Sequence, residues 1–356
     1  MELASLTVRN FRNLASLDLE LPSNGVVIIG DNGQGKTNLL EAVYYLVLFR
    51  SLRGAMDREL VRFGEAGFFI AGDASPRVTA GYEIHGRRKK VTADGKEIKK
   101  LSDAVGLVVA VALSPADRSI VEGGPAGRRR YLNVLLSLSD ATYLIALTQL
   151  RAAMKQRNAA LKRGNASEAR AFDRPVAVAG AEVAALRHKW AVGWQSRFAE
   201  LCKSMGERTA PGMVYSSRHW TPDGGAAGIQ EILRLRIERD LRRGTTTVGP
   251  HRDDLLLTLG DHDIRRFGSA GQQRTAAIAL RLLEAQALNA SHHTAPIALF
   301  DDVFAELDQD RQERLLSLIR ESLPGQAIIT APRDAEVPAA LFERPRWRMV
   351  GGALAR

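Results

Sequence analysis

The sequence predicts an α/β fold: a mixed sheet with helices that carries a mostly helical inserted second domain. Near the start, a short apolar run at 26–29 ends at a glycine and leads into a helical pattern at 38–49. Near the end, a second apolar run at 297–300 is followed by two acidic residues. Between them, residues from about 126 to 206 show the three-four apolar spacing that is typical of paired helices.

The domain organisation follows from where these patterns fall. The chain has 356 residues, 45% of them hydrophobic and 25% charged, so about two domains with real cores are expected. We assign residues 1–114 and 245–356 to one discontinuous α/β domain and residues 115–244 to the helical insert. The composition excludes a largely disordered, collagenous or small disulfide-stapled protein.

The first part of the α/β domain is expected to be rich in strands. Alternating apolar and polar residues at 3–8 and 15–21 predict two strands that each have one exposed face. Residues 66–101 indicate antiparallel strands, with Asp94-Gly95 as a tight hairpin turn. A further strand is predicted at 104–113, because an apolar run there ends just before a proline.

The insert and the second part of the α/β domain contain the remaining elements. Turns between helices are predicted at Gly164-Asn165 and at the Arg174-Pro175 step. Further along, the patterns predict strands at 231–237, 254–260, 297–300 and 327–330, and helices at 271–290 and 308–322.

The charge balance favours an anionic partner. Lysine and arginine outnumber aspartate and glutamate by 50 to 40, which gives a formal net charge of +10 and a pI near 10. Basic residues cluster at 87–90, 96–100, 128–130 and 234–243. For each cluster the alternative to nucleic-acid binding is an ordinary solvated face.

The sequence shows neither a secretory signal nor a membrane-spanning segment, and this favours the cytoplasm. The N-terminus carries charge at Glu2, Arg9 and Arg12, so it lacks the uncharged core of a secretory signal. The longest uncharged apolar run, 104–116, is too short to span a membrane. A single cysteine, Cys202, fits a reducing compartment. We expect a cytoplasmic protein with no membrane partner.

The strongest functional signal is a phosphate-binding loop in its required place between a strand and a helix. In such loops, backbone N–H groups face the β- and γ-phosphates, a lysine adds a point charge, and a hydroxyl reaches Mg²⁺. We therefore expect ATP with Mg²⁺, Lys36 also being catalytic. The expected nucleotide-binding residues are Gly30, Asp31, Asn32, Gly33, Gln34, Gly35, Lys36, Thr37 and Asn38.

A second anchor for the metal is expected from a neighbouring strand. The strand at 297–300 ends in Asp301 and Asp302. We expect Asp301 to contact Mg²⁺ together with Thr37, and Asp302 to orient or deprotonate the attacking water as the catalytic acid-base group. The alternative, a helix cap or loop acid, explains one aspartate after a strand better than a pair.

A third motif narrows the class of ATPase. Ser269-Ala270-Gly271-Gln272 stands directly before a predicted helix and resembles the signature loop of ABC-type ATPases, which binds the γ-phosphate held by the opposite subunit. We therefore expect Ser269, Gly271 and Gln272 to contact nucleotide. Residues 305–308 stand in the place of the D-loop. Helicases and GTPases lack this order of motifs, whereas an ABC transporter ATPase subunit remains as the alternative.

The chain resembles the RecF family, whose members have an SMC-like ABC-type ATPase head, in the length of its insert and in several further motifs. The separation of 265 residues between Lys36 and Asp301 exceeds what transporter subunits need, and an SMC coiled coil would be far longer. The motifs are Asn10 to Asn13, Leu113 to Asp117 with Gly124-Pro125 and Arg128 to Leu132, Gln156 to Asn158, Thr247 to Asp254, and Gly271 to Thr275.

The resemblance implies an ATP-dependent DNA-binding protein of recombinational repair and replication restart. It implies a homodimer that forms on ATP binding, with two ATP molecules between its heads, and slow, DNA-stimulated hydrolysis. It also implies binding to single-stranded, double-stranded and gapped DNA and, with RecO and RecR, promotion of RecA loading.

Three departures from ABC-type heads bear on the chemistry. Asp302 stands where such heads commonly have a glutamate, so slow turnover is expected. No glutamine occurs between Gln34 and Gln149, which leaves the Q-loop to a weak substitute, Asp117. Thr330 stands where transporters have a switch histidine. A nucleotide-binding structural protein with negligible hydrolysis is a further alternative.

Overall fold

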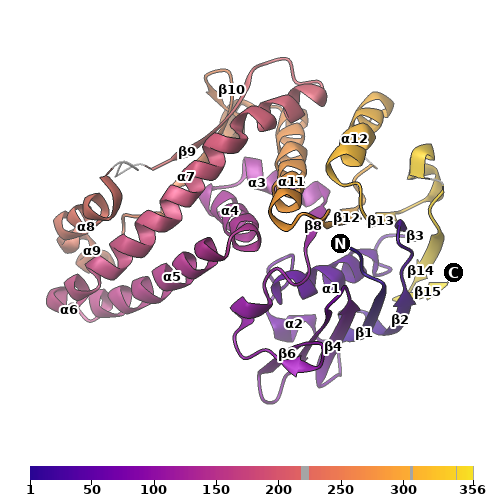
Figure 1. The fold of residues 1–356 in the computed structure, drawn as a ribbon, viewed down its shortest axis with the longest axis horizontal. Helices are drawn as coiled ribbons and strands as arrows, with labels where there is room; N and C mark the ends of the chain where they lie inside the picture. The colour runs from indigo at the N-terminus through magenta and orange to yellow at the C-terminus, as the bar shows by residue number, and fades with distance from the viewer. Residues whose placement is uncertain (218–223, 305–307, 342, 356) are drawn as a thin grey trace. The chain divides into compact units, whose positions relative to one another are not determined.

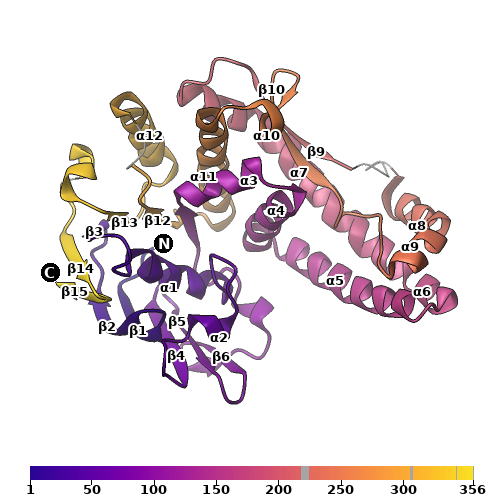
Figure 2. The same cartoon turned by 180° about the vertical axis from the view of Figure 1, so that it is seen from behind.

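The computed structural model of the chain describes residues 1–217, 224–304, 308–341 and 343–355. The chain divides into two compact units, shown in Figure 1 and from behind in Figure 2. The head unit comprises Met1–Asp117 and Leu280–Arg356, and the helical unit comprises Arg118–Ala279. No helix of the described ranges is both long and apolar enough to cross a membrane.

The first sheet of the head unit is antiparallel and has the strand order β2-β1-β4-β5-β6-β7. Its strands are β1 (Ser5–Phe11), β2 (Leu14–Glu20), β4 (Gly67–Asp73), β5 (Arg77–Glu83), β6 (Arg88–Ala93) and β7 (Lys96–Glu97). Asp94 and Gly95 both have positive φ, 47° and 77°, so the predicted tight turn between β6 and β7 is confirmed.

The second sheet has the order β15-β14-β3-β13-β12-β8, and all its strands except β15 run parallel to their neighbours. Its strands are β3 (Gly25–Ile29), β8 (Ala110–Leu113), β12 (Ile297–Asp301), β13 (Ala327–Ala331), β14 (Arg346–Val350) and β15 (Ala353–Ala355). The parallel strands β3, β8, β12 and β13 are buried on both faces, which is why they appear in the sequence as continuous apolar runs, whereas buried and exposed residues alternate in β14.

The location of helix α1 (Lys36–Leu48) between two sheets explains why it is apolar on nearly all sides. It packs against β1 and β4 of one sheet and against β8, β12 and β13 of the other. A helix between two sheets has no solvated face, so apolar residues occupy nearly its whole circumference. The head unit also contains α2 (Asp57–Leu60), α12 (Gln309–Ser322) and the second half of α11 (Ala270–His292). The predicted α/β head with a mixed sheet is confirmed.

The helical unit is built on two long helices, α5 (Ala141–Lys162) and α7 (Asp173–Ser204), which pack side by side (Figure 1). The other helices are α3 (Arg118–Glu122), α4 (Pro125–Ser139), α6 (Ala166–Ala171), α8 (Gly225–Leu235), α9 (Ile237–Arg243) and α10 (Ile264–Phe267). A small sheet has the order β11-β10-β9, from β9 (Pro211–Ser216), β10 (Asp254–Leu259) and β11 (His262–Asp263).

Three expectations need correction. The strand predicted at 231–237 is wrong, because α8 covers most of this segment; Leu233 is buried whereas Leu235 is 66% exposed, so the apparent period-two pattern does not mark one face. The strand predicted at 104–113 is confined to β8 and is preceded by a 3₁₀ turn. The break between α6 and α7 falls at Phe172, before the predicted turn.

Two further differences concern boundaries. Pro175 lies in the first turn of α7, where a missing N–H costs no helical hydrogen bond, so it does not end a helix. Residues 245–279, assigned from sequence to the head domain, group with the helical unit, since β10 pairs with β9. The domain boundaries of the ATPase head stay a prediction.

Candidate functional site

The loop after β3 has the geometry of an anion cradle. Gly33 and Gly35 have φ of 82° and 114°, a region that side chains disfavour, and α1 begins directly after them. The helix N-cap is Gly35, with no side-chain cap and no acid in the first turn. The first N–H groups of the helix therefore remain available for a bound anion such as a phosphate.

Lys36 is buried beneath this loop and is oriented by it. Its Nζ donates to the carbonyl oxygens of Gly30, at 2.6 Å, and Asp31, at 3.2 Å. By contrast, Asp31, Asn32 and Gly33 at the tip are exposed. The positive charge therefore sits inside the loop, while the tip remains open to a ligand.

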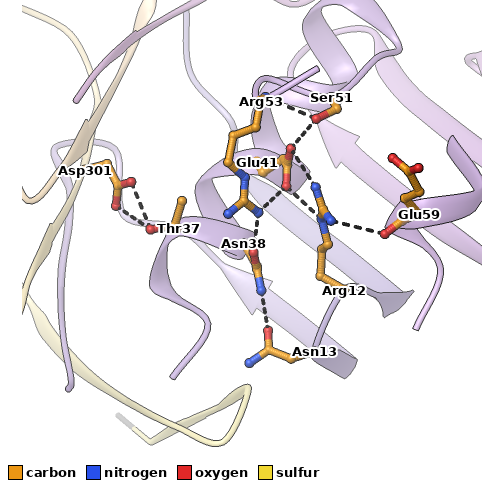
Figure 3. Close-up of polar contacts among 9 residues, drawn as sticks. All are labelled: Arg12, Asn13, Thr37, Asn38, Glu41, Ser51, Arg53, Glu59 and Asp301. Carbon is orange, nitrogen blue, oxygen red and sulfur yellow. Dashed lines mark hydrogen bonds and ion pairs between the residues drawn. The ribbon is translucent and has the colours of Figure 1, made fainter. Parts of the chain in front are cut away.

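Thr37 and Asp301 face each other across 264 residues of sequence (Figure 3). The Thr37 Oγ1 lies 2.9 Å from each carboxylate oxygen of Asp301. Burial raises the pKa of Asp301, although hydrogen bonds from Thr37 and Thr330 oppose the shift. A hydroxyl and a carboxylate at the edge of a phosphate cradle are the oxygen donors that Mg²⁺ prefers, so the residues fit the ion.

The rest of a Mg²⁺ coordination sphere has to come from outside the protein. Among the described residues no cluster of three or more His, Cys, Asp or Glu is placed to hold a metal. Mg²⁺ commonly keeps several waters and binds through one or two carboxylates plus substrate phosphates. The pair Thr37 and Asp301 is therefore suited to a nucleotide-bound Mg²⁺ rather than to a metal held by protein alone.

Thr330 connects the two aspartates. Its Oγ1 lies 2.9 Å from Oδ1 of Asp301 and 3.2 Å from Oδ1 of Asp302, and it accepts the backbone N–H of Asp302 at 3.2 Å. Asp302 has a φ of 51°, which a non-glycine residue adopts only when its surroundings hold it. Thr330 thus fixes the backbone from which the Asp302 carboxylate projects. Thr330, which stands where transporters have a switch histidine, therefore positions Asp302.

A charged network beside the loop was not assigned from sequence. Glu41, fully buried on α1, accepts hydrogen bonds from Arg12, Arg53 and Ser51 (Figure 3). Burial opposes its ionisation, yet the hydrogen bonds from Arg53, Ser51 and Arg12 hold the pKa of Glu41 below its ordinary value. One carboxylate between two partly exposed guanidinium groups leaves a surplus positive charge.

The same network positions the phosphate loop. Asn13, from the turn between β1 and β2, donates to the carbonyl oxygen of Gln34 at 3.1 Å and accepts from Asn38 at 2.8 Å. The turn between β14 and β15 donates to Gln34 from two backbone N–H groups, those of Gly351 and Gly352. The signal that could have identified Asn13 and Arg12 was their motif at 10–13, which was noticed without a function.

The predicted signature loop begins α11 in the helical unit. Ser269 and Gln272 form a reciprocal capping box: the Ser269 N–H donates to Oε1 of Gln272 at 2.9 Å, and the Gln272 N–H donates to the Ser269 hydroxyl oxygen at 3.2 Å. Ser269 is exposed, and Gly271 and Gln272 are half-buried. The predicted D-loop residues 305–307 lie outside the described residues.

Asp117, the weak Q-loop substitute, is occupied by other partners. One of its oxygens accepts the N–H of Ser114 at 2.7 Å, and the other accepts from Arg281 on α11 at 2.6 Å. Arg281 also contacts Glu284 at 2.6 Å. Burial opposes the charge on Arg281, but Asp117 and Glu284 raise its pKa. Asp117 therefore ties the segment after β8 to α11.

The motif at 247–254, one of those in which the chain resembles the RecF family, packs the helical unit. Asp254 forms a two-pronged ion pair with Arg128, at 2.8 and 2.9 Å, and Asp253 accepts from the Tyr215 hydroxyl at 2.7 Å. His251 is largely buried, with Nε2 2.9 Å from the Thr246 carbonyl oxygen, and burial lowers its pKa to about 4. The motif is structural, since its side chains join α4 and β9 to β10.

Comparison with known proteins places these features in one family. A family model for the RecF/RecN/SMC N terminal domain matches residues 2–343. The DNA replication and repair protein RecF of Myxococcus xanthus (strain DK1622) is 34% identical, over 99% of this chain and 96% of that protein. RecF of Chlamydia muridarum (strain MoPn / Nigg) is 36% identical, over 96% of each.

Solved structures agree. A structure of the recombination mediator protein RecF-ATP in the RecFOR pathway has a TM-score of 0.90 and 29% identity, covering 99% of this chain and 97% of that one. An Smc head bound to the C-winged helix domain of ScpA has a TM-score of 0.54 at 14% identity, covering 99% and 97%, and shares the fold alone. These matches do not favour the transporter alternative.

Proposed function

The chain belongs to the RecF family of DNA replication and repair proteins, and from this premise we propose that it is an ATP-dependent DNA-binding protein of recombinational repair and replication restart. The observation that carries the proposal is the contact of Thr37 with both oxygens of Asp301 beside an uncapped helix N-terminus. This arrangement suits a triphosphate with its Mg²⁺ better than any other ligand class.

In the proposed site, residues 30–38 bind ATP. The backbone N–H groups of the loop and of the first turn of α1 donate to the phosphates, and Lys36 turns its charge toward the β- and γ-phosphates. When bound, Mg²⁺ neutralises charge on the phosphate oxygens, and Thr37 and Asp301 are the residues that would hold it. The surplus charge of Arg12 and Arg53 around Glu41 adds to the attraction.

Hydrolysis is assigned to Asp302. Its carboxylate orients the attacking water and takes a proton from it, and Thr330 holds the strained backbone on which that carboxylate depends. An aspartate reaches less far than a glutamate, so turnover is slow and the protein is primarily an ATP switch. The assignment of Lys36 and Asp302 as catalytic rests on the motif and on this geometry.

The second half of the site comes from another copy of the chain. In the proposed homodimer, Ser269, Gly271 and Gln272 at the start of α11 contact the γ-phosphate bound by the partner. Support comes from the exposure of Ser269 and from a capping box that leaves the Ser269 hydroxyl hydrogen free to donate. The biological setting follows the family: cytoplasmic, with RecO and RecR as partners in RecA loading at gapped DNA.

One experiment tests nucleotide, dimer and DNA together. Sedimentation of the full chain is measured with and without ATP and Mg²⁺, and with a gapped duplex. We expect a monomer that becomes a dimer with ATP and binds the gapped DNA as a dimer. A chain that stayed monomeric with ATP, or a dimer with no affinity for DNA, would contradict the proposal.

A mixing test isolates the partner contact. Ser269→Arg should bind ATP as a monomer, yet neither dimerise nor hydrolyse, since the bulky cation blocks the partner's phosphate. In a dimer mixed with Lys36→Ala, the Ser269→Arg chain supplies an intact phosphate loop and the Lys36→Ala chain supplies an intact signature loop, so one complete site forms. ATPase activity should therefore return, up to about half per dimer if the two sites are independent. No recovery on mixing would place Ser269 outside the composite site.

A further inference from the structure

One end of the helical unit concentrates positive charge. Both Figure 1 and Figure 2 show α6, α8, α9 and the end of α5 gathered there. We call this region the arm end and define it as residues 155–174 and 229–243. These segments contain eleven lysines and arginines against five aspartates and glutamates, a net charge of +6, where the whole chain carries +10. More than half of the net charge is therefore carried by two short segments.

The fold, rather than the sequence, brings these segments together. Ala160 and Leu161 of α5, Ala169 of α6 and Ile237 of α9 form one buried apolar cluster. The segments are separated by more than fifty residues along the chain, so each sequence cluster alone is short. Their convergence on one surface distinguishes the arm end from a solvated charge run on a single helix.

Two of the acidic residues of the arm end, Asp173 and Asp240, are buried. Arg157, which is 0% exposed, donates to Asp173 at 2.8 Å and to Asp240 at 2.7 Å, and also to the Thr246 hydroxyl oxygen at 2.9 Å. Two of the five carboxylates are thus buried in a network that joins α5, α7 and α9. The network holds the three helices together and removes negative charge from the surface.

The remaining acids leave most of the basic residues unmatched. Of the three remaining acids, Glu168 pairs with Arg163 at 2.5 Å and Glu231 pairs with Arg234 at 2.7 Å, while the exposed Glu238 makes no ion pair among the described residues. Eight further basic residues make no ion pair with an acid in the described part of the chain, and all are exposed except the half-buried Arg236. They are Lys155, Lys162, Arg170, Arg174, Arg236, Arg239, Arg242 and Arg243.

We propose that the arm end binds the phosphate backbone of duplex DNA; the proposal rests on the proposed DNA-binding function and locates its surface. Eight cations held close together repel one another, and a polyanion relieves that repulsion while it releases condensed counterions. Duplex is favoured over single-stranded DNA because single-strand sites interleave basic residues with exposed aromatic rings. The one aromatic residue of the arm end, Phe172, is half-buried.

The test compares two matched triple variants of the full chain. One is Arg239→Ala, Arg242→Ala and Arg243→Ala on α9, where alanine preserves the helix. The other removes the same charge from the exposed basic segment of the head unit, by Lys96→Ala, Lys99→Ala and Lys100→Ala. Affinity for a blunt duplex is measured by fluorescence anisotropy over a series of salt concentrations, and circular dichroism checks the helix content.

We expect the head variant to bind like the wild type. The α9 variant should lose affinity by at least about tenfold near 0.1 M salt, and the slope of log affinity against log salt should fall by about 0.9 for each phosphate contact removed. Arginine-to-lysine changes at the same three positions should restore most of the binding, since charge is the main requirement. A second variant leaves α9 unchanged: Arg170→Ala with Arg174→Ala, on neighbouring helices, should also lose affinity, which would show that the loss does not come from damage to α9.

The outcomes separate this proposal from the one on which it rests. A wild-type chain that does not bind DNA would remove the proposed function. A wild type that binds, with α9 and Arg170/Arg174 variants that bind equally well, would overturn the arm end alone. Equal losses for duplex and for a single-stranded oligonucleotide would overturn the duplex assignment. Unchanged DNA binding with lost affinity for polyglutamate would identify an acidic protein as the occupant instead.

Discussion

Two buried ionic clusters of this protein have opposite charge balance, and the difference separates ligand binding from stability. In the head unit, one carboxylate, Glu41, lies between Arg12 and Arg53. In the helical unit, one guanidinium, Arg157, lies between Asp173 and Asp240. The first cluster has surplus positive charge, and its arginines are partly exposed. The second has surplus negative charge, and it is almost entirely buried.

The exposure of the surplus charge decides what each cluster does. Around Glu41, the excess cation lies beside the phosphate loop, where an anion can use it. Around Arg157, the excess anion is enclosed; burial raises the pKa of Asp173, although the hydrogen bond and charge of Arg157 oppose the shift. The head cluster is therefore expected to affect nucleotide binding, and the helical cluster only folding.

The largest effect is expected from Arg157→Leu. Removing the guanidinium leaves two buried carboxylates without their cation, and breaking a buried ion pair typically costs about 3–5 kcal/mol. Urea unfolding followed by circular dichroism measures this free energy, and Arg151→Ala, an exposed change on the same helix, is the control. ATP affinity of whatever protein remains folded should be unchanged. A loss of ATP affinity without a loss of stability would reverse the comparison.

Lys36→Ala should show the opposite pattern. The charge facing the phosphates disappears while the glycine loop and α1 remain, and a charged hydrogen bond of this kind contributes about 1.5–3 kcal/mol, or roughly 10- to 100-fold in affinity. Isothermal calorimetry with ATP measures the loss, and urea unfolding should show a nearly unchanged stability. Tight ATP binding by this variant would contradict the assigned loop.

Thr330→Val tests the positioning of Asp302. The side chains are nearly the same shape, but valine offers no acceptor to the half-buried Asp302 N–H, whose loss of a partner costs part of the about 1–3 kcal/mol of a fully buried donor. We expect single-turnover hydrolysis to slow by roughly tenfold or more, since 1.4 kcal/mol corresponds to a tenfold change. ATP affinity should change little. Thr330→Ser, which keeps the hydroxyl, should recover the rate, whereas equal slowing by both variants would point to packing.

The smallest effect is expected in the pH dependence of the free energy of unfolding, to which Glu41 and Asp173 should contribute with opposite signs. Glu41 has a lowered pKa in the folded state, so its contribution to stability is present above the ordinary glutamate pKa and is lost as the pH falls through the folded value. Asp173 has a raised pKa, so wild-type stability should increase relative to Asp173→Asn as the pH falls toward the ordinary aspartate pKa. Urea unfolding of the wild type, Glu41→Gln and Asp173→Asn between neutral and acidic pH gives both slopes. Slopes of the same sign would undo the contrast.

The sequence by itself determined the parts of the protein that are local in the chain. The phosphate loop, its strand and its helix are contiguous, and the parallel strands β3, β8, β12 and β13 are buried on both faces, so periodicity and turn chemistry were enough to find them. The parallel strand β14, in which buried and exposed residues alternate, was not predicted. The pairing of Thr37 with Asp301 was also predictable, because Asp301 ends one parallel strand and Thr37 follows the loop at the carboxyl end of another strand of the same sheet. Local pattern failed at 231–237, where tertiary packing chose the buried face.

Only the tertiary structure decided how distant charges are combined. Glu41 accepts from Arg12 and Arg53, and Arg157 contacts an acid 83 residues away, and neither grouping has a spacing that a sequence pattern could reveal. The arm end is the same kind of case, since its two segments meet only because α5, α6 and α9 share one apolar cluster. Electrostatic interactions depend on distance in space and on burial, and both of these are properties of the folded chain.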